Sequence, residues 1–167
     1  MSASGAHSSA QVVEYDSVIE RLAHDHVVIN ELLDRMEVAV PPAQLATVHS
    51  QLMREVLAHE RVEDQVLLPA MSDRGRCSGQ RGTELWVDRI VEEHKEMGQL
   101  MSAMCGLDPA GPAFEKRSSA LVFLMREHMV DEEEYMFPLL GALFTPGELA
   151  AMAEAAERAR DAVMVAD

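Results

Sequence analysis

The sequence predicts an all-α protein, an antiparallel up-down-up-down four-helix bundle with an additional short C-terminal helix. Two observations lead to this prediction. Apolar residues recur at steps of three and four through four long segments, which is the period of an amphipathic helix. Aromatic residues make up only 4% of the 167 residues, while Leu, Ala, Met, Val and Glu dominate, and this composition favours helices over strands.

The first two helices are predicted on either side of a proline pair. The apolar stripe of the first helix runs through Tyr15, Ile19, Leu22, His26, Ile29, Leu33 and Met36. Pro41 and Pro42 end it, because proline lacks the N–H that a helix interior needs. A second helix is predicted from Ala43 to about Ala70, with an inner face made of Leu45, Val48, Leu52, Val56, His59, Glu63, Val66 and Ala70. Residues 73–79 are predicted to form a loop.

The third and fourth helices are predicted at residues 81–105 and 113–143, separated by a segment rich in Gly and Pro. The inner face of the third carries Trp86, Ile90, His94, Met97, Met101 and Met104, and that of the fourth carries Leu121, Leu124, His128, Glu132, Tyr135 and Leu139. A shorter helix is expected at about 146–165, because Thr145, Pro146 and Glu148 form a capping box with proline at the first helical position. We therefore expect a disordered polar tail at 1–12 and a single domain at 13–167, with the bundle at about 14–143.

The acidic composition argues against several classes of partner. A formal net charge of −15 is unfavourable for nucleic-acid binding, which relies on a basic surface. The longest apolar runs are far too short to cross a bilayer, and the first ten residues lack the basic and apolar regions of a secretory signal. We therefore expect a cytoplasmic protein with no membrane partner. Cys77 and Cys105 flank the third helix about 36 Å apart, so they are predicted to be free thiols.

One pattern of histidine and glutamate occurs twice in the chain. The first copy consists of His26, His59 and Glu63, and the second of His94, His128 and Glu132. The offset is 68 residues between the first histidines and 69 residues between the other two pairs. In each copy the second histidine and the glutamate are four residues apart, so they lie on one helix face, one turn apart. All six lie on predicted inner faces at similar distances from the helix breaks, so they should converge in the core.

A metal ion is the simplest explanation for six such side chains in a core. A single histidine on an apolar face is more often a hydrogen-bonded core residue, and a purely structural polar core is the alternative here. Burying Glu63 and Glu132 without compensation would cost roughly several kcal/mol each, and no arginine or lysine lies on the predicted inner faces to pair with them. Four imidazoles and two carboxylates suit a pair of non-haem irons better than zinc, whose structural sites are usually tetrahedral. The predicted metal ligands are therefore His26, His59, Glu63, His94, His128 and Glu132.

The double pattern resembles the hemerythrin-like family, also called the HHE cation-binding domain. In that family each half reads His, then H-x-x-x-E followed by an apolar-proline step, and here these steps run from Glu63 to Pro69 and from Glu132 to Pro138. The resemblance covers about residues 15–143. It implies a bundle whose core holds two iron ions, bridged by both glutamates and by an oxo or hydroxo group, that handles dioxygen, peroxide or nitric oxide.

One departure from the oxygen carriers of this family bears on function. The carriers place two histidines four residues apart on the third helix, whereas here His94 is followed at that spacing by Gly98. Two six-coordinate irons offer about twelve positions, of which the implied ligands fill about ten, so roughly two stay open. A reversible carrier is expected to keep a single guarded open position. Gly98, lining the open positions, therefore indicates redox chemistry on peroxide or oxygen rather than transport.

The expected function is reaction with, or sensing of, peroxide or dioxygen at a di-iron site, with catalase-like decomposition of peroxide favoured. One alternative is reversible binding of dioxygen or nitric oxide, and another is an iron-responsive regulatory module that a protein partner recognises. Tyr135, three residues past Glu132, is a candidate hydrogen-bond donor, radical relay or phenolate ligand, or it packs only. The expectation for the acidic neighbours Asp64, Glu93, Glu133 and Glu134 is that most are solvated, with Asp64 or Glu133 able to support a ligand. His24 and His49 are expected at the surface.

Overall fold

The computed structural model describes residues 15–38, 41–78 and 81–165, and the tail predicted at 1–12 lies outside these ranges. Within them every regular element is helical. The order is α1 (Val18–Glu37), α2 (Pro42–Val62), η1 (Glu63–Leu67), α3 (Leu68–Ser78), α4 (Arg81–Met104), α5 (Pro112–Asp131), η2 (Glu132–Met136), α6 (Phe137–Leu143) and α7 (Pro146–Met164). Two of these elements, η1 and η2, are π-helical turns that join their neighbours without a break.

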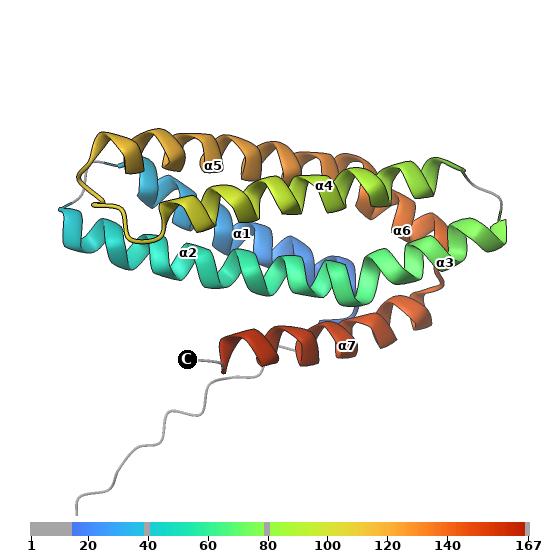
Figure 1. Ribbon diagram of the computed structural model, residues 1–167. Coiled ribbons are helices and arrows are strands. Elements are labelled where there is room, and N and C mark those ends of the chain that lie inside the picture. The colour runs from blue at the N-terminus through green and yellow to red at the C-terminus, as the bar shows by residue number, and fades with distance from the viewer. Residues whose placement is uncertain (1–14, 39–40, 79–80, 166–167) are drawn as a thin grey trace, which may run out of the picture.

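The helices form four long segments that lie alongside one another, as predicted (Figure 1). Segments two and four are composite, running from α2 through η1 to α3 and from α5 through η2 to α6. The additional helix, α7, lies outside the bundle and packs against α1, α2 and η1 (Figure 1). The sequence prediction of an all-α four-helix bundle with an extra C-terminal helix is confirmed.

The helix ends follow from local sequence. The Ser17 hydroxyl accepts a hydrogen bond from the Glu20 N–H and so caps α1, and α2 starts with proline at its first position. Gly106, just past α4, has a φ of +76°, a left-handed conformation that favours glycine at a helix C-terminus. Thr145 and Glu148 form both hydrogen bonds of the predicted capping box at the start of α7.

The prediction of a loop at residues 73–79 was wrong. Residues up to Ser78 belong to α3, and only position 79 lies outside the described residues. Gly75 does not break the helix, since one glycine costs only about 1 kcal/mol there. It serves packing instead, because a Cβ at this position would lie 2.9 Å from the Thr83 Cβ of α4. An ion pair between Arg74 and Glu148 also ties α3 to α7.

Beyond the π turns, the predicted inner faces of the second and fourth segments were wrong. A π turn inserts one extra residue into the helix, so every later side chain rotates away from its expected face. The positions predicted to be inward, Val66, Ala70, Tyr135 and Leu139, are not fully buried. The next residue in each case is buried, and these four are Leu67, Met71, Met136 and Leu140. Both composite segments therefore shift by one position at the same point of the repeat.

Prolines explain where the π turns occur. Pro69 and Pro138 each lie six residues beyond the glutamate that begins the turn. A proline ring inside an α-helix clashes with the carbonyl four residues earlier, and the wider π turn relieves that clash. The hydrogen bonds show the wide spacing, since the N–H of Leu68 donates to the Glu63 carbonyl and that of Phe137 to the Glu132 carbonyl.

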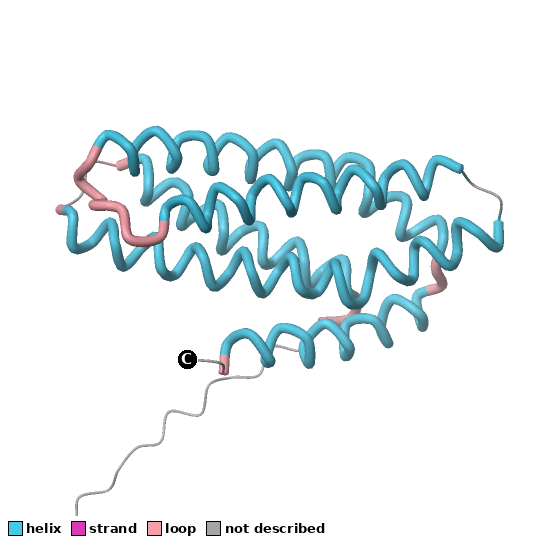
Figure 2. The backbone as a smooth tube through the Cα atoms, in the orientation of Figure 1, coloured by secondary structure: helices cyan, strands magenta, loops and turns pink. Residues whose placement is uncertain are grey.

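The core consists of two apolar clusters separated along the bundle by a polar layer. One cluster includes Leu22, Val62 and Leu140 and extends to α7, and the other includes Ile29, Val56 and Met125. Loops are confined to the ends of the helices (Figure 2), so the polar layer between the clusters is built on helices alone. Within the described chain no single helix is long and apolar enough to cross a membrane. Pro112–Leu143 and Pro146–Met164 pass that test only as a pair bent by 119°.

Candidate metal centre

The six predicted ligands meet in the polar layer, and all of them are buried. Suitable donor atoms of His59, Glu63, His128 and Glu132 all lie within 4.8 Å of one another. The other two histidines complete the group from α1 and α4, since His26 Nε2 lies 2.9 Å from Glu132 Oε2 and His94 Nε2 lies 3.0 Å from Glu63 Oε2. Each of these contacts joins the histidine of one half to the glutamate of the other. The sequence halves are therefore interleaved at the site.

The imidazoles are arranged as two pairs around the two glutamates. The ring centroids of His26 and His59 are 5.0 Å apart, and those of His94 and His128 are 5.2 Å apart. The two pairs are further from each other, with 6.3 Å between His59 and His128. His59 Nε2 lies 3.4 Å from Glu132 Oε2 and 3.6 Å from Glu63 Oε2, so the glutamates occupy the space between the pairs.

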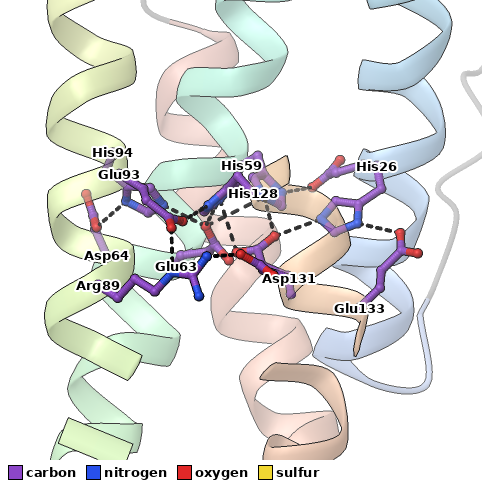
Figure 3. A network of polar contacts seen from close by, with 12 residues as sticks. His26, His59, Glu63, Asp64, Arg89, Glu93, His94, His128, Asp131 and Glu133 are labelled. Carbon is purple, nitrogen blue, oxygen red and sulfur yellow. Dashed lines mark hydrogen bonds and ion pairs between the residues drawn. The ribbon is translucent and has the colours of Figure 1, made fainter. Parts of the chain in front are cut away.

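Four outer carboxylates, those of Asp25, Asp64, Glu93 and Glu133, lie behind the four histidines. Figure 3 labels the last three of them. The distances from Nδ1 to the nearest carboxylate oxygen are 2.7 Å for Glu133 on His26, 3.0 Å for Asp64 on His94 and 2.9 Å for Glu93 on His128. Asp25 Oδ2 is 3.9 Å from His59 Nδ1, beyond hydrogen-bond distance. A carboxylate at Nδ1 fixes the ring orientation and keeps Nε2 directed at the centre, as in metal-binding histidines.

The sequence identified only part of this outer layer. Asp64 and Glu133 contact His94 and His26, the kind of contact that the sequence analysis allowed for these two acids. Glu93 contacts His128, so the expectation that it is solvated was wrong. Asp25 was missed. A signal for both was present, because the residue before the first histidine is acidic in each half, and so is the residue after the glutamate.

Charge is concentrated in this layer, and the imidazoles compensate the carboxylates. Burial disfavours protonation of His94 and His128. Hydrogen bonds that His94 donates to Asp64 and Glu63 nevertheless raise its pKa to about 9, and the carboxylates of Glu132, Glu63 and Glu93 raise the pKa of His128 to about 10. Burial opposes ionisation of Glu132, yet His128 and its other partners hold its pKa well below the usual range. Protonated imidazoles and ionised carboxylates thus stabilise each other, a role that a metal cation can take over.

The donor set fits a metal. His59 Nε2, His128 Nε2, Glu63 Oε1 and Glu132 Oε1 are buried and have no hydrogen-bond partner among the described residues. Buried polar atoms are normally satisfied, so unpaired donor atoms that face one another mark a place for a cation. Imidazole and carboxylate together suit iron.

Comparison with known proteins agrees with this chemistry. Residues 17–140 match the sequence profile of the Hemerythrin HHE cation binding domain, and residues 86–165 match it a second time. The chain belongs to the hemerythrin HHE family. The second match begins 69 residues after the first, the offset of the repeat itself. Family membership and the His/Glu cluster together make this a metal-binding domain.

Two individual proteins are similar to this HHE domain. The crystal structure of a hemerythrin HHE cation binding domain-containing protein from Mycobacterium kansasii has a TM-score of 0.70 and 24% identity, covering 87% of this chain and 88% of that one. This likeness shows the shared fold. A DNA nickase of Nostoc sp. is 24% identical over 113 residues, or 68% of this chain. The chain spans only 30% of the length of that relative.

The HHE domain contains one buried acid that breaks the symmetry of the repeat. Glu60 is 8% exposed, its Oε1 has no hydrogen-bond partner among the described residues, and burial raises its pKa to about 7. It lines a pocket of about 510 Å³ between α2, η1 and α7, together with Asp64 and Ala162. At the equivalent position of the second half lies Met129. The sequence analysis missed Glu60, although the Glu-to-Met difference was visible there.

The remaining candidates lie outside the buried cluster. Tyr135 is 52% exposed and stacks on Trp86 at a centroid distance of 5.5 Å, so it is not inward as predicted, and its role at the site stays a prediction. Gly98 lies one turn beyond His94, and a Cβ there would meet nothing within 4 Å. His24 is exposed, as expected, but His49 is half-buried beside Phe114. The cysteines, Cys77 and Cys105, are free and exposed.

Proposed function

We propose that this HHE domain binds two iron ions and decomposes hydrogen peroxide in a catalase-like reaction. The observation that carries the proposal is the arrangement of two histidine pairs around two shared glutamates, with an acidic partner behind each ring. A single ion would leave one pair of imidazoles without a function. Two ions would give each pair of imidazoles a metal, with the carboxylates of Glu63 and Glu132 within reach of both pairs.

The chemistry needs no external reductant. One peroxide takes up two electrons and two protons and becomes two waters. A second peroxide is oxidised to dioxygen and releases two electrons and two protons, so the two half-reactions balance. Two irons held by the six histidine and glutamate residues would supply the two-electron redox capacity that this reaction needs. The chain's own residues prepare the site. The outer carboxylates fix the orientation of the imidazoles, and the two apolar clusters shield the polar layer from bulk water.

Space beside His94 favours turnover over carriage. A Cβ at Gly98, one turn beyond His94, would meet nothing within 4 Å, and we propose that a small molecule approaches the second histidine pair past this position. The ligand set also leaves roughly two coordination positions free on two irons. Peroxide is small enough to use this room and requires exchange of water or hydroxide at such positions.

The test combines metal content, spectrum and gas evolution. We expect about two irons per chain by assay, near-ultraviolet absorption typical of a ferric pair, and one dioxygen released for every two peroxides consumed. His128→Ala, loaded in the same way, serves as the control for turnover by loosely bound iron. Full iron occupancy with no dioxygen release would contradict the catalytic proposal, and no bound iron would contradict the metal proposal.

Reversible binding of dioxygen or nitric oxide is the second candidate, because the same open space admits either gas. It predicts a spectral change on adding the gas to reduced protein, reversed on removing it, without consumption of peroxide. DNA is not proposed as a substrate. The net charge of −15 is unfavourable for binding a polyanion, and the activity of the DNA nickase of Nostoc sp. is not carried over because the match covers only 30% of that relative's length.

A further inference from the structure

The repeat places an outer carboxylate behind every histidine, but one of the four is held by a separate buried ion network. Asp25 is fully buried, and its Oδ1 pairs with Arg21 of α1 and lies 2.9 Å from Nη1 of Arg160 of α7. Arg160 also pairs with Glu55 of α2, and Arg21 Nε lies 3.3 Å from Glu157 Oε1 of α7. The network therefore joins three helices directly behind His59.

The atoms of Asp25 and His59 that face each other are left without other partners. Asp25 Oδ2 and His59 Nδ1 are both buried, and neither has a hydrogen bond to the described residues. They are 3.9 Å apart, so a movement of about 1 Å brings them to hydrogen-bond distance. The position of the carboxylate is set by the arginines, and the arginine from α7 is only 13% exposed in its side chain. Where α7 sits thus determines how closely Asp25 can approach His59.

We propose that Arg160 is a positioning residue for the metal centre: it holds Asp25 behind His59, and through this pair the docking of α7 and metal binding strengthen each other. The inference rests on the proposed metal site. A metal bound at Nε2 makes Nδ1–H a stronger hydrogen-bond donor, which draws Asp25 and its arginines toward the bundle. The coupling is reciprocal. If docking of α7 raises the metal affinity by some factor, bound metal raises the docking equilibrium of α7 by the same factor.

The packing of α7 suits such a coupling. Its docked face is made mostly of small side chains, with Ala153, Ala156 and Ala159 buried against the bundle and Leu149 as the larger contact. Small side chains let the helix approach closely but bury little apolar area each, so the ion network is a substantial part of what holds its C-terminal half. The helix also contacts η1, the turn that begins with Glu63.

The experiment measures both directions of the coupling. The parent protein and Arg160→Met, which keeps the apolar stem and removes the charge, are loaded with Fe²⁺ without oxygen, and iron loss to a coloured chelator is followed. We expect Arg160→Met to release iron about tenfold faster or more, a size typical for losing a supporting hydrogen bond, and Arg160→Lys to recover part of the difference. In parallel, amide exchange in α7 of the parent should slow by a similar factor when Fe²⁺ binds.

Arg74→Ala is the matched control. It removes the ion pair between Arg74 and Glu148 at the N-terminal end of α7, so it weakens that end alone and leaves the C-terminal half of the helix docked through Arg160 and Asp25. We expect unchanged iron release in this variant. Equal release from the parent and Arg160→Met, or exchange in α7 that ignores Fe²⁺, overturns the proposal. If Arg160→Met does not fold, the exchange measurement on the parent decides alone. A parent that binds no Fe²⁺ at all contradicts the proposed function instead, so the two failures are distinct.

Discussion

The two halves of the candidate centre have the same histidine and glutamate residues but differ in what lies behind them. In the second half, Glu93 is bonded to His128 at 2.9 Å, its side chain is 24% exposed, and its arginine, Arg89, is half in solvent. In the first half, Asp25 is fully buried between two arginines and stands 3.9 Å from His59. A carboxylate near the surface can be replaced by water, whereas a buried one cannot.

The helix outside the repeat causes this difference. α7 packs on α1 and α2 and so closes the back of His59, while α4 and α5 carry His94 and His128 on the other side of the bundle (Figure 1). The second half also has open space, at the position where Gly98 lacks a side chain. Gly98 takes the place that Asn30 has in the first half, where the amide lies 4.0 Å from the sulfur of Met129. The duplication thus repeats the His/Glu residues of the site, and the added helix encloses the back of His59 but not that of His128.

The largest expected effect tests what the halves have in common. His59→Ala and His128→Ala should each lower bound iron to less than about one per chain, because each removes an imidazole from the group around the two glutamates. Iron is measured by a colorimetric assay after desalting. His24→Ala and His49→Ala are the controls, as both lie outside the cluster, and they should keep full iron. Complete occupancy in His59→Ala or His128→Ala would show that the ligand assignment is wrong.

The second prediction tests the difference between the halves. Asp25→Asn should weaken iron retention by about 10 to 100-fold, and Glu93→Gln by about tenfold or less, because water can reach the site of Glu93 but not that of Asp25. Asp25→Asn should also lower the free energy of unfolding, since it leaves Arg21 and Arg160 buried with less counter-charge. Chelator competition and denaturant unfolding measure these two effects. Equal losses in both variants would mean that enclosure by α7 has no energetic consequence.

The sequence predicted the ligand layer because two simple periodicities carry it. Helical spacing placed His26 and His94 in apolar stripes, and the duplicated offset linked them to the two H-x-x-x-E pairs. These features are local, so they can be read without knowing how the helices pack. The acidic neighbours followed the same offsets, yet their roles depend on which helix lies opposite, and helical spacing alone made them look solvated.

The errors begin where the helical period itself changes. Extrapolating the α-helical period past Glu63 and Glu132 placed Val66 and Tyr135 inside, whereas the π turns bury Leu67 and Met136. Pro69 and Pro138 were the only local signals of this change. The network of Asp25 with Arg160 could not be predicted from the repeated His/Glu pattern, because α7 lies beyond that pattern and its docking is a tertiary contact.

The third prediction tests the open side of the centre. Gly98→His should reduce peroxide turnover by at least about tenfold, a barrier increase of about 1.4 kcal/mol, because the new imidazole lies one turn from His94 and takes up coordination space. Iron content should stay at the parent level, and the reduced variant should bind oxygen more reversibly. Gly98→Ala is the control, since its Cβ enters open space without adding a ligand. Parent-like turnover with the added histidine coordinated would place the reaction elsewhere, with Tyr135 as the next candidate.

The last prediction concerns Glu60, the buried acid that the second half replaces with Met129, and its effect is confined to stability. Its pKa lies at about 7 instead of 4.5, so its ionisation opposes folding from about pH 4.5 upward and reaches its full cost of about 3 kcal/mol once the pH exceeds 7. Glu60→Met should therefore stabilise the metal-free protein by up to about 3 kcal/mol at pH 8, and the part due to ionisation should fall below about 1 kcal/mol at pH 5.

Thermal unfolding of the chelated parent and Glu60→Met at pH 5 and pH 8 measures this gain, which should appear as a rise in Tm of several degrees at the higher pH. Packing of the methionine contributes equally at both values, so the difference between them isolates the carboxyl group. Glu60→Gln removes the same charge with little change in shape and should show the same pH dependence. If the gain in Tm is equal at pH 5 and pH 8 in both variants, Glu60 is not an uncompensated acid in the folded protein, and the halves differ in their outer carboxylates and open space alone.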